Sequence, residues 1–186
     1  MKSFNFEFLR TDWPELASLA GFAEQYAHTD PPSALVKLRA FVEQLVEAVY
    51  QLLGLPRPVQ PNLIDLLRED AFQQAVPTVA LDTMHAIRIN GNKAAHGAGA
   101  KTETSLWLLK ESHRLGRWLY MTFSGAGADT IPTYQDPTPE LVGGKSKAEL
   151  KREKKAIRWR RREARRPCIR RTSGRATDAG RQPVRQ

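Results

Sequence analysis

Four polar side chains in the middle of the sequence have residue types and a spacing that could perform chemistry. His85, Arg88, Asn92 and His96 step by three, four and four residues, so they would share one face of a regular helix. Histidine can act as a general acid or base near neutral pH, and arginine can hold a phosphate and its developing charge. Metal-independent RNA cleavage by Arg88 and His96 is therefore one hypothesis for this row.

The same row also has a structural interpretation, which we favour on the residues alone. Such side chains can anchor loops, cap carbonyl groups or pair with acids on a neighbouring helix, and His96 near a helix C-terminus is favoured by the helix dipole. Gly91, Ala94 and Ala95 are small, so another helix could approach closely at this point.

A second candidate for chemistry is a basic segment near the C-terminus. Residues 1–123 hold 12 Lys and Arg against 13 Asp and Glu, a net of −1, whereas residues 124–186 hold 17 against 7, a net of +10. Clustered cations bind phosphates by releasing counterions, and a tryptophan among them could stack on a base. The candidate nucleic-acid-binding residues are Lys151, Arg152, Lys154, Lys155, Arg158, Trp159, Arg160, Arg161 and Arg162.

Two interpretations of this basic segment stay open. It is either a genuine tail that binds DNA or RNA without sequence specificity, or the product of a frameshift in a GC-rich gene. From about Ile157 the chain loses the periodicity of Leu, Glu and Ala that a linker helix would continue, and Arg, Ala, Gly, Pro and Thr dominate.

Several classes of function are excluded by composition and motif. Cys168 is the only cysteine, so the chain has no internal disulfide and no cysteine-based metal site. Residues 1–10 do not form a secretory signal, and no stretch approaches the roughly 18 apolar residues of a membrane span, so we expect a cytoplasmic protein without a membrane partner. Gly143-Gly-Lys-Ser146 lacks the glycine spacing of a Walker A motif. We predict no metal or other cofactor.

The elements that must position these residues are all predicted to be helical. A helix capped by Thr11 or Asp12 should run to about His28, and Asp30 should cap a long helix that ends at Gly54. Further helices are expected at residues 62–69, 79–95 and 103–123. The sequence thus predicts an all-α fold, a single bundle of about five helices over residues 1–123. A Pro/Gly linker at 124–144 and a tail at 145–186, partly helical and then disordered, should follow.

The segment Arg88-Ile-Asn-Gly-Asn-Lys-Ala-Ala-His96 and the upstream Leu35-Val-Lys-Leu-Arg39-Ala-Phe-Val-Glu43 also carry a family resemblance. Together with residues 4–9, 62–67 and 107–120, they resemble the helical N-terminal domain of type I restriction enzyme R subunits. The resemblance covers about residues 3–123, and residues 145–155 resemble the start of the coiled linker that follows.

This resemblance implies a relation to the HEPN helical superfamily, in which several members are ribonucleases with an Arg followed by four to six residues and a His. Here seven residues separate Arg88 from His96, and Asn92 stands four positions before His96. In the R subunits of type I site-specific deoxyribonucleases, DNA cleavage and translocation belong to later domains, so the resemblance implies neither activity for residues 3–123.

We therefore expect a non-catalytic accessory and assembly domain of a restriction-modification defence system, present as a truncated or frameshifted fragment. Its partners would be other subunits or domains of a restriction complex, and docking would need an exposed apolar patch, for example on the helix at 103–123. The alternative is a HEPN-type ribonuclease that uses Arg88 and His96 across a homodimer. Nucleic-acid binding by the tail is compatible with the first hypothesis.

Overall fold

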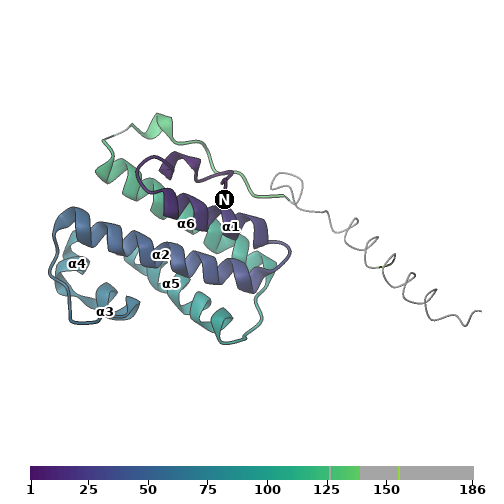
Figure 1. The fold of residues 1–186 in the computed structure, drawn as a ribbon, viewed down its shortest axis with the longest axis horizontal. Helices are drawn as coiled ribbons and strands as arrows, with labels where there is room; N and C mark the ends of the chain where they lie inside the picture. Colours follow the sequence, from purple (N-terminus) through teal and green to yellow (C-terminus); the bar gives the residue numbers. More distant parts are fainter. Residues whose placement is uncertain (126, 139–154, 156–186) are drawn as a thin grey trace, which may run out of the picture. The chain divides into compact units, whose positions relative to one another are not determined.

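The computed structural model describes residues 1–125, 127–138 and 155. Residues 1–125 and 127–138 form six α-helices and two short 3₁₀ helices without a strand, which confirms the predicted all-α class. The elements are η1 (Glu7–Leu9), α1 (Pro14–Tyr26), α2 (Pro31–Leu53), α3 (Leu63–Arg68), α4 (Asp70–Ala75), α5 (Thr78–Ala95), α6 (Thr102–Phe123) and η2 (Ala128–Thr130) (Figure 1). They belong to one unit, Met1–Ser146, and the second unit, Lys147–Gln186, is described only at Lys155.

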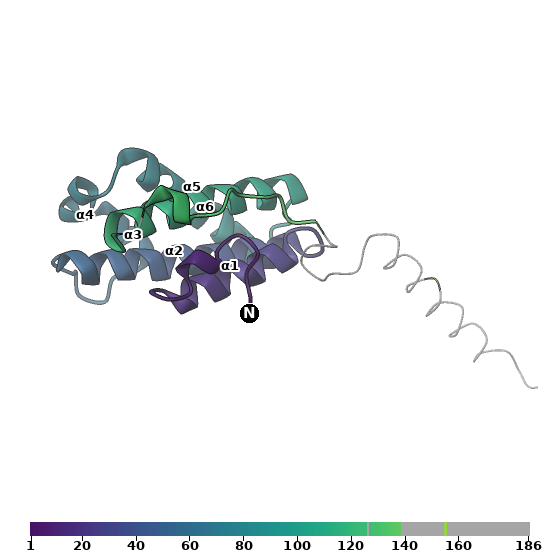
Figure 2. The same ribbon diagram turned by 90° about the horizontal axis from the view of Figure 1, so that it is seen from above.

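The long helix α2 organises the bundle, and both of its ends follow the predicted signals. The Asp30 side chain accepts a hydrogen bond from the backbone N–H of Ser33, and Gly54 ends the helix in the left-handed conformation at φ 61°. Between these ends, α2 packs against α1, α5 and α6. Figure 2 shows α1 and α2 forming one layer and α5 and α6 the other.

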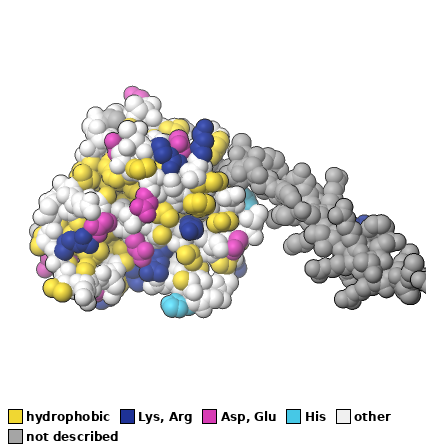
Figure 3. All heavy atoms as spheres, viewed as in Figure 1, with side chains coloured by type: hydrophobic (Ala, Val, Ile, Leu, Met, Phe, Trp, Pro, Cys, Tyr) yellow, Lys and Arg dark blue, Asp and Glu magenta, His cyan; other side chains and the backbone are white. Residues whose placement is uncertain are grey.

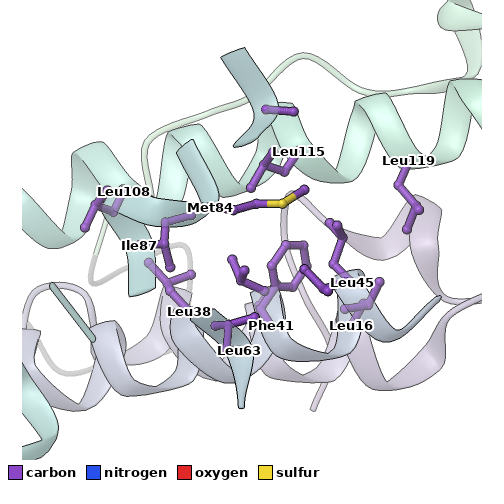
Figure 4. Close-up of a cluster of buried hydrophobic side chains, with 14 of the residues drawn as sticks. Leu16, Leu38, Phe41, Leu45, Leu63, Met84, Ile87, Leu108, Leu115 and Leu119 are labelled. Atoms are coloured by element: carbon purple, nitrogen blue, oxygen red, sulfur yellow. The ribbon is translucent and has the colours of Figure 1, made fainter. Parts of the chain in front are cut away.

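The core lies between these two layers and draws on every long helix. Figure 4 shows Leu38, Phe41 and Leu45 of α2 pointing toward Met84 and Ile87 of α5. Leu108, Leu115 and Leu119 of α6 and Leu16 of α1 close the same cluster, and all of these side chains are at most 2% exposed. Burial of this apolar surface is the main force that holds the four helices together.

One helix more was found than the sequence predicted. The helix expected at 62–69 ends at Arg68, because Glu69 adopts an extended conformation (ψ 128°), and α4 then starts at Asp70. Phe72 of α4 is fully buried and stacks on Tyr50 of α2 with ring centroids 5.2 Å apart. A six-residue helix with one apolar anchor has too little periodicity to be recognised in a sequence.

The predicted N-cap of α1 was wrong by one or two residues. Neither Thr11 nor Asp12 caps α1, whose N-cap residue is Trp13 without a side-chain cap bond. The reason lies in the preceding η1, because the backbone N–H of Trp13 bonds the carbonyl of Leu9 and carries the turn forward to Pro14. The N-cap positions of α5 and α6 are likewise held by Pro77 and Lys101 without side-chain cap bonds.

The described start of the segment assigned to a linker packs against the bundle. Ile131 and Pro137 are buried, and Asn5 exchanges two hydrogen bonds with the backbone of Gln135, at 2.9 and 2.8 Å. His28, just after α1, donates a hydrogen bond to the carbonyl of Pro137 in the same segment. Apolar residues at 131, 134 and 137 give this segment something to bury. The rest of the predicted linker lies outside the described residues, and so do the charged helix and disordered tail apart from Lys155.

None of the helices within the described part of the chain is long and apolar enough to span a membrane.

Candidate functional site

The row of polar residues lies along one side of α5. This helix is continuous from Thr78 to Ala95, and His96 is its C-cap residue. His85, Arg88 and Asn92 are half-buried, whereas His96 is exposed. His96 stands eight positions after Arg88, which is a rise of about 12 Å along the helix axis. Within one chain, the backbone positions of Arg88 and His96 are therefore far apart for two side chains that would act on the same phosphate.

Burial and a neighbouring cation set the electrostatics of the row. Burial, and after it the nearby Arg88 guanidinium, lower the pKa of His85 below its ordinary value. Both effects favour the uncharged form of this imidazole. The Nε atom of Arg88 is buried and has no hydrogen-bond partner among the described residues.

A second arginine, Arg39 of α2, which sequence reasoning missed, lies against α5 at Gly91. Gly91 allows α2 to come so close that a Cβ placed on it would lie 2.5 Å from Cβ of Arg39 and 3.0 Å from the carbonyl oxygen of Leu35. The predicted close approach of a helix at the small residues is thus confirmed at Gly91. Arg39 forms an ion pair with Glu43 at 2.7 Å, and its own Nε is buried without a partner in the described part. Gly91 was the sequence signal that another helix comes close at this point. The sequence does not indicate which helix that is, so it could not point to Arg39.

On one face of the bundle, charges of both signs are mixed rather than gathered into a basic cleft. On the face drawn in Figure 3, Lys and Arg side chains lie interspersed with Asp, Glu and hydrophobic side chains. No group of three or more His, Cys, Asp and Glu side chains within the described part could hold a metal ion. Lys155 is exposed, and the other candidate residues of the basic tail lie outside the described residues.

An apolar hollow opens on another side of α5, between this helix and α6. Val79 is 78% exposed and Trp107 is 52% exposed, although both are large apolar side chains. At 100° per residue, positions 79, 83 and 86 of α5 face away from positions 85, 88 and 92, so the hollow and the polar row are separate surfaces. The hollow has a volume of about 310 Å³ and is lined by Val79, Asp82, Thr83, Ala86, Trp107, Leu108 and Glu111.

The side of α6 that faces away from the core continues this surface toward the C-terminus. We call it the outer face of α6, and it consists of Trp107, Lys110, Arg114, Arg117, Trp118 and Met121. A second hollow lies at its far end, between Arg114, Trp118 and Met121, and Met121 is 46% exposed. Exposed apolar side chains therefore do occur on the helix where a docking patch was expected.

Comparison with known proteins gives this helical bundle a family. A family model described as "Domain of unknown function (DUF4145)" matches residues 22–159, which is most of the chain. The chain belongs to the DUF4145 family. The matched residues of this DUF4145 chain include α2 to α6, and with them the polar row and the outer face of α6.

The DUF4145 chain is also similar to the type I restriction enzyme EcoKI endonuclease subunit of Escherichia coli K12. The two are 32% identical over 120 residues, which are 64% of this chain and 10% of that subunit. The chain thus spans about a tenth of the relative it matches. This agrees with the resemblance to type I restriction enzymes, whereas the HEPN relation stays a prediction. No solved structure matches the chain.

Proposed function

We propose that this DUF4145 chain is a non-catalytic assembly module of a type I restriction system, which docks against other subunits or domains of a restriction complex. The observation that carries the proposal is the apolar hollow between α5 and α6, with Val79 78% and Trp107 52% exposed. Large apolar side chains gathered in this way on a surface are typical of sites where another protein binds. The similarity to a restriction endonuclease subunit supports the choice of partner.

The geometry of the polar row supports a structural role there. Arg88 is half-buried, its Nε is enclosed, and it starts about 12 Å along the helix from His96. A phosphate-binding arginine should instead present its nitrogen atoms to solvent beside the general acid or base. Gly91, next to Asn92 of the row, lies against Arg39 of α2, and this close packing of the two helices supports a structural role for this part of α5.

Docking is tested with the full chain and a purified type I restriction complex that lacks its endonuclease subunit. We expect the chain to be retained on the immobilised complex, and Val79→Ser and Trp107→Ala to weaken retention. Val59→Ser is the matched control, because Val59 is 94% exposed and lies in the connection between α2 and α3. Equal retention of all four proteins, or of none, would remove the docking function.

The alternative function is a HEPN-type ribonuclease acting with Arg88 and His96 across a homodimer. It is supported by the lowered pKa of His85 beside Arg88 and by the shared side of the helix. The test is RNA and DNA cleavage by the full chain in EDTA, compared with Arg88→Ala and His96→Ala. RNA cleavage that both variants abolish while remaining folded would replace the assembly module by a nuclease.

Two further hypotheses about the basic tail stay predictions. If residues 145–186 bind nucleic acid, their deletion should remove an affinity for DNA and RNA that falls steeply with salt. If a frameshift near codon 157 produced the tail, the other reading frames of the gene should encode helicase and nuclease motifs beyond that codon. Their absence would exclude a frameshifted endonuclease subunit.

A further inference from the structure

We infer that the outer face of α6 binds an acidic amphipathic helix of about four turns, supplied by a partner protein. The inference rests on the proposed docking function and names the chemistry of the partner. It depends on three features of α6: its unpaired cations, its exposed apolar residues and the spacing between them.

The charges of this face favour an acidic partner. Lys110 and Arg117 are exposed, and neither forms an ion pair with any described residue. Arg114 is paired with Glu111 at 2.7 Å, and its side chain is still 64% exposed. The centre of the face therefore carries three cations, of which only Arg114 is paired with the neighbouring Glu111, and complementary carboxylates on a partner would steer it to this face.

The apolar residues of the face stand at both ends of this basic centre. Trp107 is 52% and Met121 is 46% exposed, and Trp118 packs edge-on against Phe123 with ring centroids 6.3 Å apart. Tryptophan, methionine and arginine are the residue types enriched where proteins bind one another. A partner with apolar residues at both ends and acids between them would match this order.

The spacing indicates that the partner segment is helical. Trp107, Arg114 and Met121 recur every seven residues, which keeps them in one stripe along α6 and is the repeat of two helices packed side by side. The stripe is about 21 Å long, because 14 residues separate its ends and each adds about 1.5 Å. A helix of about 14 residues covers that length.

Two other occupants fit the same face less well. Trp107 and Trp118 are eleven residues apart, about 16 Å along the axis, so successive bases of a single strand could not stack on both. A second copy of this chain would bring two sets of Lys110, Arg114 and Arg117 together, and like charges across an interface oppose binding.

The test uses the full chain and a fluorescein-labelled designed peptide of 16 residues, with leucines at helical spacing of three and four and glutamates between them. Binding is measured by fluorescence anisotropy. The same peptide with lysine in place of glutamate, and a 16-nucleotide oligo-dT, are the comparison probes. The cations of residues 145–186 are present in every variant, so their contribution cancels when variants are compared.

We expect Lys110→Glu/Arg117→Glu to weaken binding of the acidic peptide about tenfold, since two favourable charge contacts become repulsive. Met121→Ser should also weaken it, because an exposed apolar anchor is lost. The matched control is Lys2→Glu/Arg68→Glu, which makes the same change in charge at exposed positions away from α6 and should bind like the parent.

Three results would overturn the inference. The first is an acidic peptide that does not bind, or binds Lys110→Glu/Arg117→Glu as well as the parent. The second is oligo-dT binding that depends on α6 while peptide binding does not. The third is a dimer in sedimentation velocity that these variants abolish. If the variants instead leave the restriction complex bound while Val79→Ser releases it, the assembly function stands and only this inference fails.

Discussion

The buried histidine of α6 makes the stability of this protein depend on pH in a predictable way. His113 is 3% exposed, and its ring meets those of Phe6, Phe8 and Tyr134 at centroid distances of 5.4, 5.5 and 5.3 Å. Its Nε2 atom has no hydrogen-bond partner among the described residues. Burial, and after it the charge of Arg117, lower the pKa of His113 from 6.5 to about 4.

The sign and size of the effect follow from these two values. Between pH 6.5 and 4 the unfolded chain binds a proton at His113 and the folded chain does not, so folding loses free energy as the pH falls. A pKa difference of one between the folded and unfolded chain corresponds to about 1.36 kcal/mol, so the full loss of folding free energy is about 3 kcal/mol. About 2 kcal/mol of this is lost between pH 7.5 and 5. Stopping at pH 5 keeps the titration of carboxylates small.

Urea denaturation at pH 7.5 and at pH 5 measures this loss in the parent and in His113→Phe, which keeps an aromatic ring but cannot titrate. His85→Asn is the control, because the lowered pKa of half-buried His85 acts in the same direction. We expect the loss to persist in His85→Asn and to disappear mostly in His113→Phe. An equal loss in the parent and in His113→Phe would show that His113 is not the titrating group.

Three other substitutions test the packing by urea denaturation. Gly91→Ala should lower the free energy of unfolding by about 1–3 kcal/mol, because the new Cβ meets Arg39, although alanine favours a helix more than glycine does. Gly99→Ala is the control and should change little, because nothing lies near its Cβ position. Glu24→Ala should cost on the order of 3 kcal/mol of stability, since the buried carboxylate accepts four hydrogen bonds from Ser3, Phe4 and Asn5. A Glu24→Gln variant that is as stable as the parent would contradict this. Asn62→Ala should cost about 1 kcal/mol through loss of the capping box, and no loss would mean that α3 is held by packing alone.

The parts of the fold that could be predicted from sequence are those with a local physical signal. The α2 helix has a capping aspartate, a continuous apolar stripe and a terminal glycine, and its C-terminal end was predicted to the residue. The start of the helix predicted from residue 62 was also confirmed, because α3 begins at Leu63 with Asn62 as its N-cap. Two elements that depend on a contact distant in sequence were missed. The first is α4, where Phe72 stacks on Tyr50, and the second is the segment around Gln135, which is hydrogen-bonded to Asn5.

The same distinction applies to the candidate site. The helical spacing of His85, Arg88 and Asn92 was enough to put them on one side of α5. The neighbour of α5 at Gly91 was not predictable, because Arg39 comes close to Gly91 only through the packing of α2 against α5. The hollow beside Trp107 is also formed by two helices, so neither helix alone could reveal it.

The arrangement of α5 makes the two candidate surfaces separable by mutation. Its buried residues, among them Met84, Ile87 and Gly91, face the core. The polar row lies on one flank of this buried strip, and Val79, Thr83 and Ala86 lie on the other, toward α6. A partner seated on α6 would therefore leave Arg88 and His96 uncovered. If Trp107→Ala loses docking and Arg88→Ala keeps it, the protein uses the flank toward α6. If Arg88→Ala abolishes RNA cleavage and Trp107→Ala does not, the protein uses the flank with the polar row.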